Sequence, residues 1–291
     1  MKIAISTDTS CTISKALAEK LNIKVFPLNV IVNGEEFLDG ISINQEKLKD
    51  DMVAGKTIKT STPPPASIVE YFKNLFDEGY DQIIHFTISS QLSSMNQLFN
   101  FISEEEFNKK IVVIDSYAVS TLMLSHVLYA YEEINKGTSI DDILSAIEER
   151  KQNNAVVFIP ENLNALKNGG RISPAIALLG NMIGLKPILT LKEGKLDKDT
   201  MARNAKKAMS ERLSALLNDY PLDKFDVCIT SFYGNEQLVD YLQKQVQASN
   251  PDYIAPIVPL SINVCAHTGP GTIGIVVSPK IGEKSIVEYL I

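Results

Sequence analysis

The stretch NVCAHTGPGTIGIVV, residues 263–277, spells G-x-G-x-x-G directly after His267. That spacing is typical of a dinucleotide-binding turn, in which a strand ends, glycines form the turn, and a helix N-terminus receives the pyrophosphate. Here the glycines precede TIGIVV, whose β-branched residues favour a strand over a helix. The acidic ribose ligand is expected about 20 positions further on, and only residues 275–291 follow Gly274. We therefore reject the dinucleotide interpretation. Two readings stay open: a tight turn before an edge strand, or a turn that brings the backbone close to a ligand.

Around this stretch, the first half of the chain alternates β-branched runs with amphipathic segments. Several of the runs are apolar on both faces, which is typical of a covered parallel sheet. Strands are expected at 2–6, 24–32, 82–88 and 110–116. Helices are expected at 14–21, 44–54, 66–79, 94–102 and 119–136, with another starting near Ser139, and with Ser14 and Asn44 as N-caps.

The second half repeats the alternation less regularly. Strands are expected at 155–159, 187–191, 195–197, 225–230, 253–260 and 272–277, and helices at 200–218 and 235–248. Glu193-Gly194 has the composition of a hairpin turn. The mixture predicts an α/β protein with two sheets, divided into domains 1–153 and 154–291 that pack closely.

Composition excludes several classes of function. The apolar fraction of 45% and charged fraction of 22% are those of a soluble globular protein, and a net charge of −7 argues against nucleic-acid binding. Three widely spaced cysteines predict neither disulfides nor a zinc site and fit a cytoplasmic protein. The N-terminus does not resemble a signal peptide. The apolar segment 172–191 is interrupted by polar residues and proline, so we expect it to be buried or to face a ligand rather than to span a membrane.

Three loops carry more hydroxyls and glycines than turns require. They are KTSTPPP (59–65), TISSQLSSMNQ (87–97) and NGGRIS (168–173). The second follows a predicted parallel strand, where ligands usually bind. Simple helix caps would explain one hydroxyl in each of the first two loops. Arg171 in the third has the chemistry to bind a phosphate or carboxylate, or to pair with a surface glutamate. Arg203 is expected early in a helix, where the helix dipole disfavours a cation.

The sequence offers one alternative based on catalysis. His85 and His126 lie in apolar stretches and are interpreted as core histidines. Ser93 as nucleophile with His267 as base would make a serine esterase, although no acidic residue adjoins His267 in sequence. A binding protein is the other reading that the residues leave open.

Taken together, these loops resemble the DegV family of bacterial fatty-acid-binding proteins over nearly the whole chain. The matching segments are STDTSCTIS, KTSTP, SSQLSS, VIDS, LNALKNGGRIS, KPIL and AHTGPGTIG, in the family's order and spacing. The chain is most similar to the lipid-binding subunit of the fatty-acid kinase system. Two positions depart from the common pattern near the serine pair: Ser94 replaces glycine and Met95 replaces threonine. Thr62 replaces glutamine.

The resemblance implies a Rossmann-like N-terminal domain, a mixed α/β C-terminal domain, and one long-chain fatty acid buried between them, without a cofactor or metal. Segment 172–191 would help to line the tunnel. By the same resemblance, the carboxylate would be held by Thr60, Ser61, Ser93, Ser94, His267 and Thr268. Arg171 and Arg203 would serve the acyl-phosphate and an ATP-dependent kinase partner that feeds phospholipid synthesis. The binding subunit itself would not catalyse.

Overall fold

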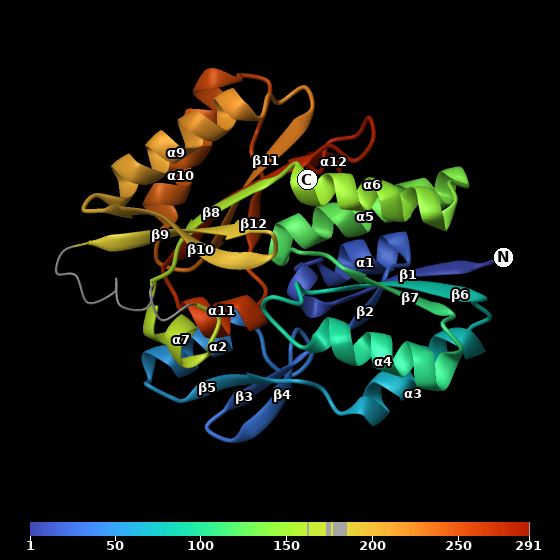
Figure 1. Cartoon of the computed structure of the whole chain (residues 1–291). Coiled ribbons are helices and arrows are strands. Elements are labelled where there is room, and N and C mark those ends of the chain that lie inside the picture. Colours follow the sequence, from blue (N-terminus) through green and yellow to red (C-terminus); the bar gives the residue numbers. More distant parts are fainter. Residues whose placement is uncertain (162, 173–175, 177–184, 291) are drawn as a thin grey trace.

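The computed structural model describes residues 1–161, 163–172, 176 and 185–290, which form an α/β protein (Figure 1). A parallel four-stranded sheet has the order β2-β1-β6-β7. Its strands are β1 (Ile3–Asp8), β2 (Lys24–Phe26), β6 (Gln82–Thr87) and β7 (Ile111–Asp115). The runs predicted at 2–6, 82–88 and 110–116 are thus confirmed as strands of a covered parallel sheet.

Both faces of this sheet are covered because adjacent residues of its strands point to opposite sides. Ala4 and Ile83 pack toward α3 (Pro65–Asp77) and α4 (Met95–Phe107). Ile5 and Ile84 belong to the core that contains α5. Other helices of this half are η1 (Thr9–Cys11), α1 (Lys15–Leu21), α5 (Ser120–Lys136) and α6 (Ile140–Gln152). Ser14 caps α1, as predicted, by accepting a bond from the Leu17 N–H.

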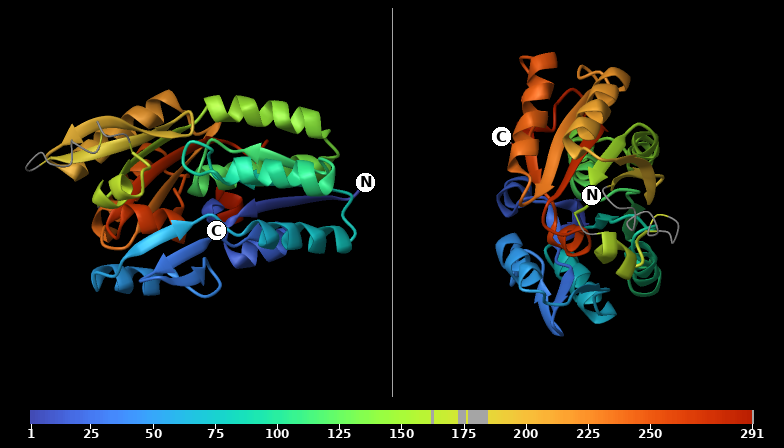
Figure 2. Two further views of the ribbon diagram at one scale, coloured as in Figure 1. Left: turned by 60° about the horizontal axis from the view of Figure 1, so that its bottom comes forward. Right: turned by 90° about the vertical axis from the view of Figure 1, so that its left-hand side faces the viewer.

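The expected single strand at 24–32 is wrong, because the chain forms two strands in different sheets. Pro27 separates β2 from β3 (Asn29–Val32) and cannot donate to a sheet ladder. β3 pairs antiparallel with β4 (Glu35–Leu38) and with β5 (Ile58–Ser61). Thr60 and Ser61, expected in a loop, therefore lie on a strand. Figure 2 shows these three strands and α2 (Gln45–Val53) from two further sides.

A six-stranded sheet has the order β10-β9-β8-β13-β11-β12. Its strands are β8 (Ala155–Ile159), β9 (Lys186–Lys192), β10 (Lys195–Ala202), β11 (Phe225–Phe232), β12 (Ile257–Pro259) and β13 (Thr272–Pro279). One face packs on α9 (Ala205–Asp219) and α10 (Glu236–Ser249). The other belongs to the core that contains α5, which also packs against β1 and β13.

Several expectations in this half are corrected. The hairpin turn at Glu193-Gly194 is confirmed, with both residues at positive φ. β10 continues to Ala202, so the helix starts at 205 rather than 200, and Arg203 lies between strand and helix. The strand expected at 253–260 covers only Ile257–Pro259. β13 pairs with β8 and β11, so the glycine turn precedes a central strand, not an edge strand.

His267 lies on helix α11 (Ile262–Thr268), not on a loop as expected. α11 packs against α2, β5 and the short helix α7 (Leu163–Asn168). The chain ends near α12 (Val287–Leu290). Of the segment 172–191 that was expected to line a tunnel, residues 173–175 and 177–184 lie outside the described residues, whereas Ile172 and Ile176 are buried.

The remaining histidines are core residues, as predicted. His85 is fully buried, stacks on Phe99, and its Nδ1 lies 2.8 Å from Ser6 Oγ. His126 is fully buried on α5. All three cysteines are free and buried. Within the described residues, no helix is both long and apolar enough to cross a bilayer.

Candidate functional site

A cavity lies between the carboxyl ends of the parallel strands and the α5-facing side of the six-stranded sheet. It contains about 1180 Å³ of space not occupied by atoms, including its mouth. In the parallel sheet, β2 and β6 flank β1 on opposite sides, and ligands in open α/β sheets bind where the strand order reverses in this way. The loop after β6 therefore faces a place where a ligand site is expected.

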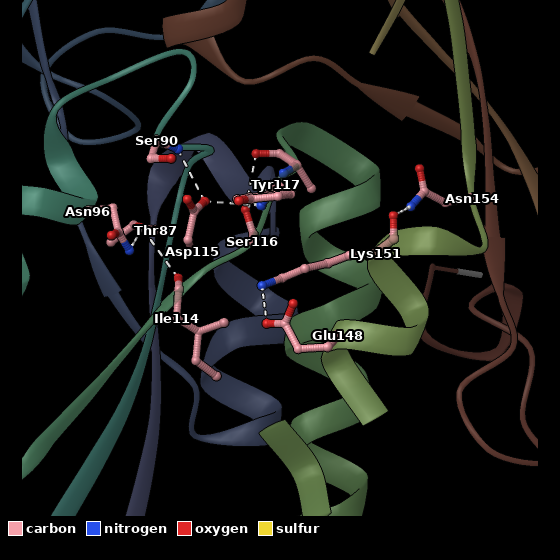
Figure 3. A network of polar contacts seen from close by, with 11 residues as sticks. Thr87, Ser90, Asn96, Ile114, Asp115, Ser116, Tyr117, Glu148, Lys151 and Asn154 are labelled. Carbon is pink, nitrogen blue, oxygen red and sulfur yellow. Dashed lines mark hydrogen bonds and ion pairs between the residues drawn. The ribbon is translucent and has the colours of Figure 1, made fainter. Parts of the chain in front are cut away.

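That loop is held by carboxylates on both sides. Asp8, fully buried at the end of β1, accepts a hydrogen bond from the Ile88 N–H at 3.0 Å, and burial raises its pKa to about 6. Asp115, at the end of β7, accepts bonds from the N–H groups of Ser90 and Tyr117, each at 3.1 Å (Figure 3). The Ser89 hydroxyl donates to the Gly194 carbonyl at 2.7 Å, which ties the loop to the β9–β10 turn. These bonds fix the backbone that carries Ser93.

The polar end of the cavity contains a hydrogen bond between two distant segments. Thr60 Oγ1 on β5 lies 2.8 Å from His267 Nε2 on α11. Burial, together with the nearby Arg171 cation, lowers the pKa of His267 to about 4, so the ring is neutral at pH 7. Gly169, just after α7, permits this placement: a Cβ there would lie 2.6 Å from His267 Nδ1.

Arg171 and Ser93 complete the polar end. Arg171 lines the cavity, and its guanidinium donates to the carbonyls of Leu92, at 3.2 Å, and of Gly169. Ser93 lines the cavity too, and its Oγ accepts a bond from the Met95 N–H at 3.3 Å. The polar end of the cavity therefore places the Arg171 cation and the hydroxyls of Thr60 and Ser93 beside a neutral histidine.

The rest of the wall is mainly apolar. Val156, Phe158 and Val276 line it from the six-stranded sheet, and Leu92 and Leu166 are among the residues that line it from elsewhere. Further apolar lining residues are Leu28, Ile88, Met95, Val119, Leu191, Leu196, Leu260 and Val264.

The three glycines of the opening stretch have structural roles. Gly274 lies directly between Thr230 and Phe158 in the sheet, and a Cβ there would lie 3.0 Å from Thr230 Cγ2 and 3.1 Å from Phe158 Cβ. Because Gly274 has no side chain, it leaves space in the cavity at this part of its wall, which we call the cavity floor. Gly269 and Gly271 have positive φ of 80° and 102°, as the turn from α11 into β13 requires.

The structure brings together most of the predicted site residues. Thr60, Ser61, Ser93, Arg171, His267 and Thr268 line the cavity. Thr268 Oγ1, however, donates to the Val264 carbonyl within α11. Ser94 is exposed at the start of α4 and is not among the described residues that line the cavity. Arg203 is also exposed and outside the lining.

Sequence reasoning missed several polar lining residues. Ser120, Thr230, Asn263 and Thr272 belong to the wall. Asn263 lies in the opening stretch, but its role depends on a residue 224 positions away: its Nδ2 donates to the buried Asp39 at 2.7 Å. No local pattern marks Ser120 or Thr230, because each reaches the cavity only through the packing of α5 and of the six-stranded sheet.

The geometry does not favour the serine esterase. His267 Nε2 bonds to Thr60, and no hydrogen bond joins it to Ser93. Among the described residues, His267 has no carboxylate partner, and a ring whose pKa is about 4 is a weak base at neutral pH. The described residues also contain no cluster of histidine, cysteine or acidic side chains able to hold a metal ion.

Comparison with known proteins gives a consistent family. The family model described as "Uncharacterised protein, DegV family" matches residues 2–280. A DegV domain-containing protein of Clostridium acetobutylicum is 27% identical over 285 residues, which cover 96% of this chain and 99% of that protein. One of Streptococcus pyogenes is 28% identical over 284 residues, with 97% and 100% covered.

Solved structures of DegV family proteins are also similar to this chain. A DegV family protein from Thermus thermophilus, whose structure is described as showing fatty acid binding, is 30% identical with a TM-score of 0.87, covering 96% of this chain and all of the other. DegV of Bacillus subtilis, described as a fatty acid binding protein, is 25% identical with a TM-score of 0.86 and the same coverage. The fold is that of these proteins, and the chain belongs to the DegV family.

Proposed function

We propose that this protein binds one long-chain fatty acid in the cavity, with the carboxylate at the polar end and the acyl chain along the apolar wall. The observation that carries the proposal is the Thr60–His267 pair at one end of an otherwise mainly apolar cavity. The fatty acid binding described for the Thermus thermophilus and Bacillus subtilis relatives supports it.

The head-group chemistry follows from the neutral state of His267. With its proton on Nε2, the ring donates to Thr60 Oγ1. The Thr60 hydroxyl hydrogen is then free to donate to a carboxylate oxygen. Arg171 supplies a nearby positive charge, and Ser93, whose oxygen already accepts from the Met95 N–H, keeps its own hydrogen for donation. A carboxylate accepts such charge-assisted bonds well.

The acyl chain provides most of the affinity in this proposal. Each buried methylene contributes about 0.8 kcal/mol, so about ten of them would contribute about 8 kcal/mol before the costs of ordering. A long chain can therefore be held without a strong ion pair at the head group.

The site also supports presentation of the carboxylate to a partner kinase for acyl-phosphate formation. Thr60, Arg171 and His267 line a second, outer depression as well, so the head-group residues form the boundary between the cavity and the surface. A carboxylate held there would be reachable by an ATP-using enzyme. We include in this proposal that the exposed Arg203 contacts that partner, and that the protein itself performs no chemistry.

The first experiment is denaturing extraction of the purified protein, followed by mass spectrometry of the released lipid. We expect about one long-chain acid per chain. Delipidated protein should take up oleate or palmitate, and Ser93→Ala should weaken uptake, whereas Ser94→Ala, at the exposed neighbouring serine, should not. Protein that carries no acid and takes up neither would refute the proposal.

The kinase step needs a separate measurement. Loaded protein is mixed with a fatty-acid kinase and ATP, and acyl-phosphate is trapped with hydroxylamine. We expect Arg203→Ala to reduce trapping without reducing lipid content. An equal loss of both would contradict the role assigned to Arg203.

A further inference from the structure

Two buried hydroxyls in the cavity wall have no hydrogen-bond partner among the described residues. Ser120 and Thr230 both line the cavity and are each only 4% exposed. Neither Ser120 Oγ nor Thr230 Oγ1 makes a hydrogen bond within the part of the chain that the structure describes. By contrast, Thr268 and Thr272, in the same wall, donate to backbone carbonyls of α11 and the glycine turn.

The two hydroxyls come from two elements, β11 and α5, that each pack against β13. Thr230 on β11 lies directly opposite Gly274 of β13, on the cavity floor. Ser120 is the first residue of α5, which packs against β13. Ser120 has a φ of 57°, in the left-handed region that a residue other than glycine rarely adopts. Such strained residues occur often at ligand sites.

Packing does not explain these hydroxyls. A buried hydroxyl without a partner is unfavourable, whereas valine has nearly the shape of threonine without that cost. Thr230 stands among apolar floor residues such as Phe158 and Val276, where an aliphatic side chain would suffice. An oxygen on the ligand would provide the missing partner.

We propose that Ser120 and Thr230 form a second polar subsite, which selects fatty acids that carry a hydroxyl group on the acyl chain. The chain hydroxyl accepts a hydrogen bond from one of these side chains and donates to the other. This inference rests on the proposed function, because it places the acyl chain in the same cavity. It adds a class of ligand that the carboxylate site by itself would not distinguish.

The test is a competition between acids that differ only in this hydroxyl. Delipidated protein is offered equimolar stearic acid and single positional isomers of hydroxystearic acid, and the retained acids are quantified by mass spectrometry. We expect at least one isomer to be preferred about tenfold, equivalent to about 1.4 kcal/mol, since binding sites that pair with a ligand hydroxyl discriminate against analogues that lack it.

The variants make the test specific. Thr230→Val and Ser120→Ala should abolish the preference while stearic acid is still retained, and Thr230→Ser, which keeps a hydroxyl, should preserve it. Thr190→Val is the matched control: Thr190 pairs with Val157, away from the cavity, and bonds to the Val156 carbonyl at 2.8 Å. This control should leave the preference unchanged.

Three results would overturn the inference, and they can be distinguished. If no hydroxylated isomer is retained better than stearic acid, or if Thr230→Val keeps the preference, the proposed subsite is wrong, whereas the proposed fatty-acid site is unaffected. If no acid of either kind is retained by the wild-type protein, the proposed function fails and this inference fails with it.

Discussion

Replacing Thr60 by valine tests the head-group site most directly, because the side chain keeps its shape and loses only its hydroxyl. Thr60 Oγ1 is the atom that bonds to His267 Nε2 at 2.8 Å. Two effects follow. The His267 ring loses its partner in a largely buried position, and the carboxylate of the bound acid loses a donor.

The two effects are measured separately, one as stability and the other as affinity. Leaving a buried polar group unpaired costs about 1–3 kcal/mol of folding free energy, visible in the delipidated protein. A hydrogen bond to a charged group contributes about 1.5–3 kcal/mol, so affinity for the acid should fall by about tenfold to about 150-fold.

The assay compares wild type, Thr60→Val and Thr57→Val. Thr57 is exposed just before β5, so its substitution controls for a generic threonine-to-valine effect. Denaturant unfolding of delipidated protein gives the stability term, and displacement of a fluorescent fatty acid gives the affinity. An affinity equal to that of Thr57→Val would refute the assignment of Thr60 to the head group, even if stability fell as expected.

Three further predictions concern the glycines and His267. Gly169→Ala would place a Cβ 2.6 Å from His267 Nδ1; the resulting displacement of the ring should weaken retention of the acid in extraction assays, and unchanged retention would show that this ring position is unimportant. Gly274→Val would place a side chain in the cavity floor beside Thr230 and Phe158, so less long-chain acid should bind to the variant, as measured by mass spectrometry of the extracted lipid. Equal binding would mean that the acyl chain does not pass over Gly274. The folded protein protonates His267 only near pH 4, against 6.5 for the ordinary ring, so stability should be lost as pH falls from about 6.5 to about 4, by up to about 3 kcal/mol. Denaturant unfolding of His267→Gln should lack that part of the loss, and an identical pH profile would contradict the lowered pKa.

Part of the fold could be read from local sequence pattern. The β-branched runs at 82–88 and 110–116 are apolar on both faces and form buried parallel strands. The turn at Glu193-Gly194 was also predictable, because glycine is favoured in two-residue hairpin turns. The structure places both residues at positive φ, as such a turn requires. The three-stranded sheet was not, since β4 is short and mostly exposed and becomes a strand only by pairing with β3.

In the candidate site, too, the sequence pointed to individual residues but not to the contacts between them. Hydroxyl-rich loops and the family resemblance pointed to Thr60, Ser93 and His267 from the sequence. The bond between Thr60 and His267 joins residues 207 positions apart, and the helix that carries His267 was expected to be a loop.

Local sequence was enough to predict the buried strands at 82–88 and 110–116 and to single out the hydroxyl-rich segments, because β-branched runs and clustered hydroxyls are properties of short stretches. The neutral state of His267, the place of Gly274 in the cavity wall, and the lack of hydrogen-bond partners for Ser120 and Thr230 among the described residues arise only from tertiary packing. Burial and hydrogen-bond pairing depend on elements that meet only after folding, and no local pattern records them.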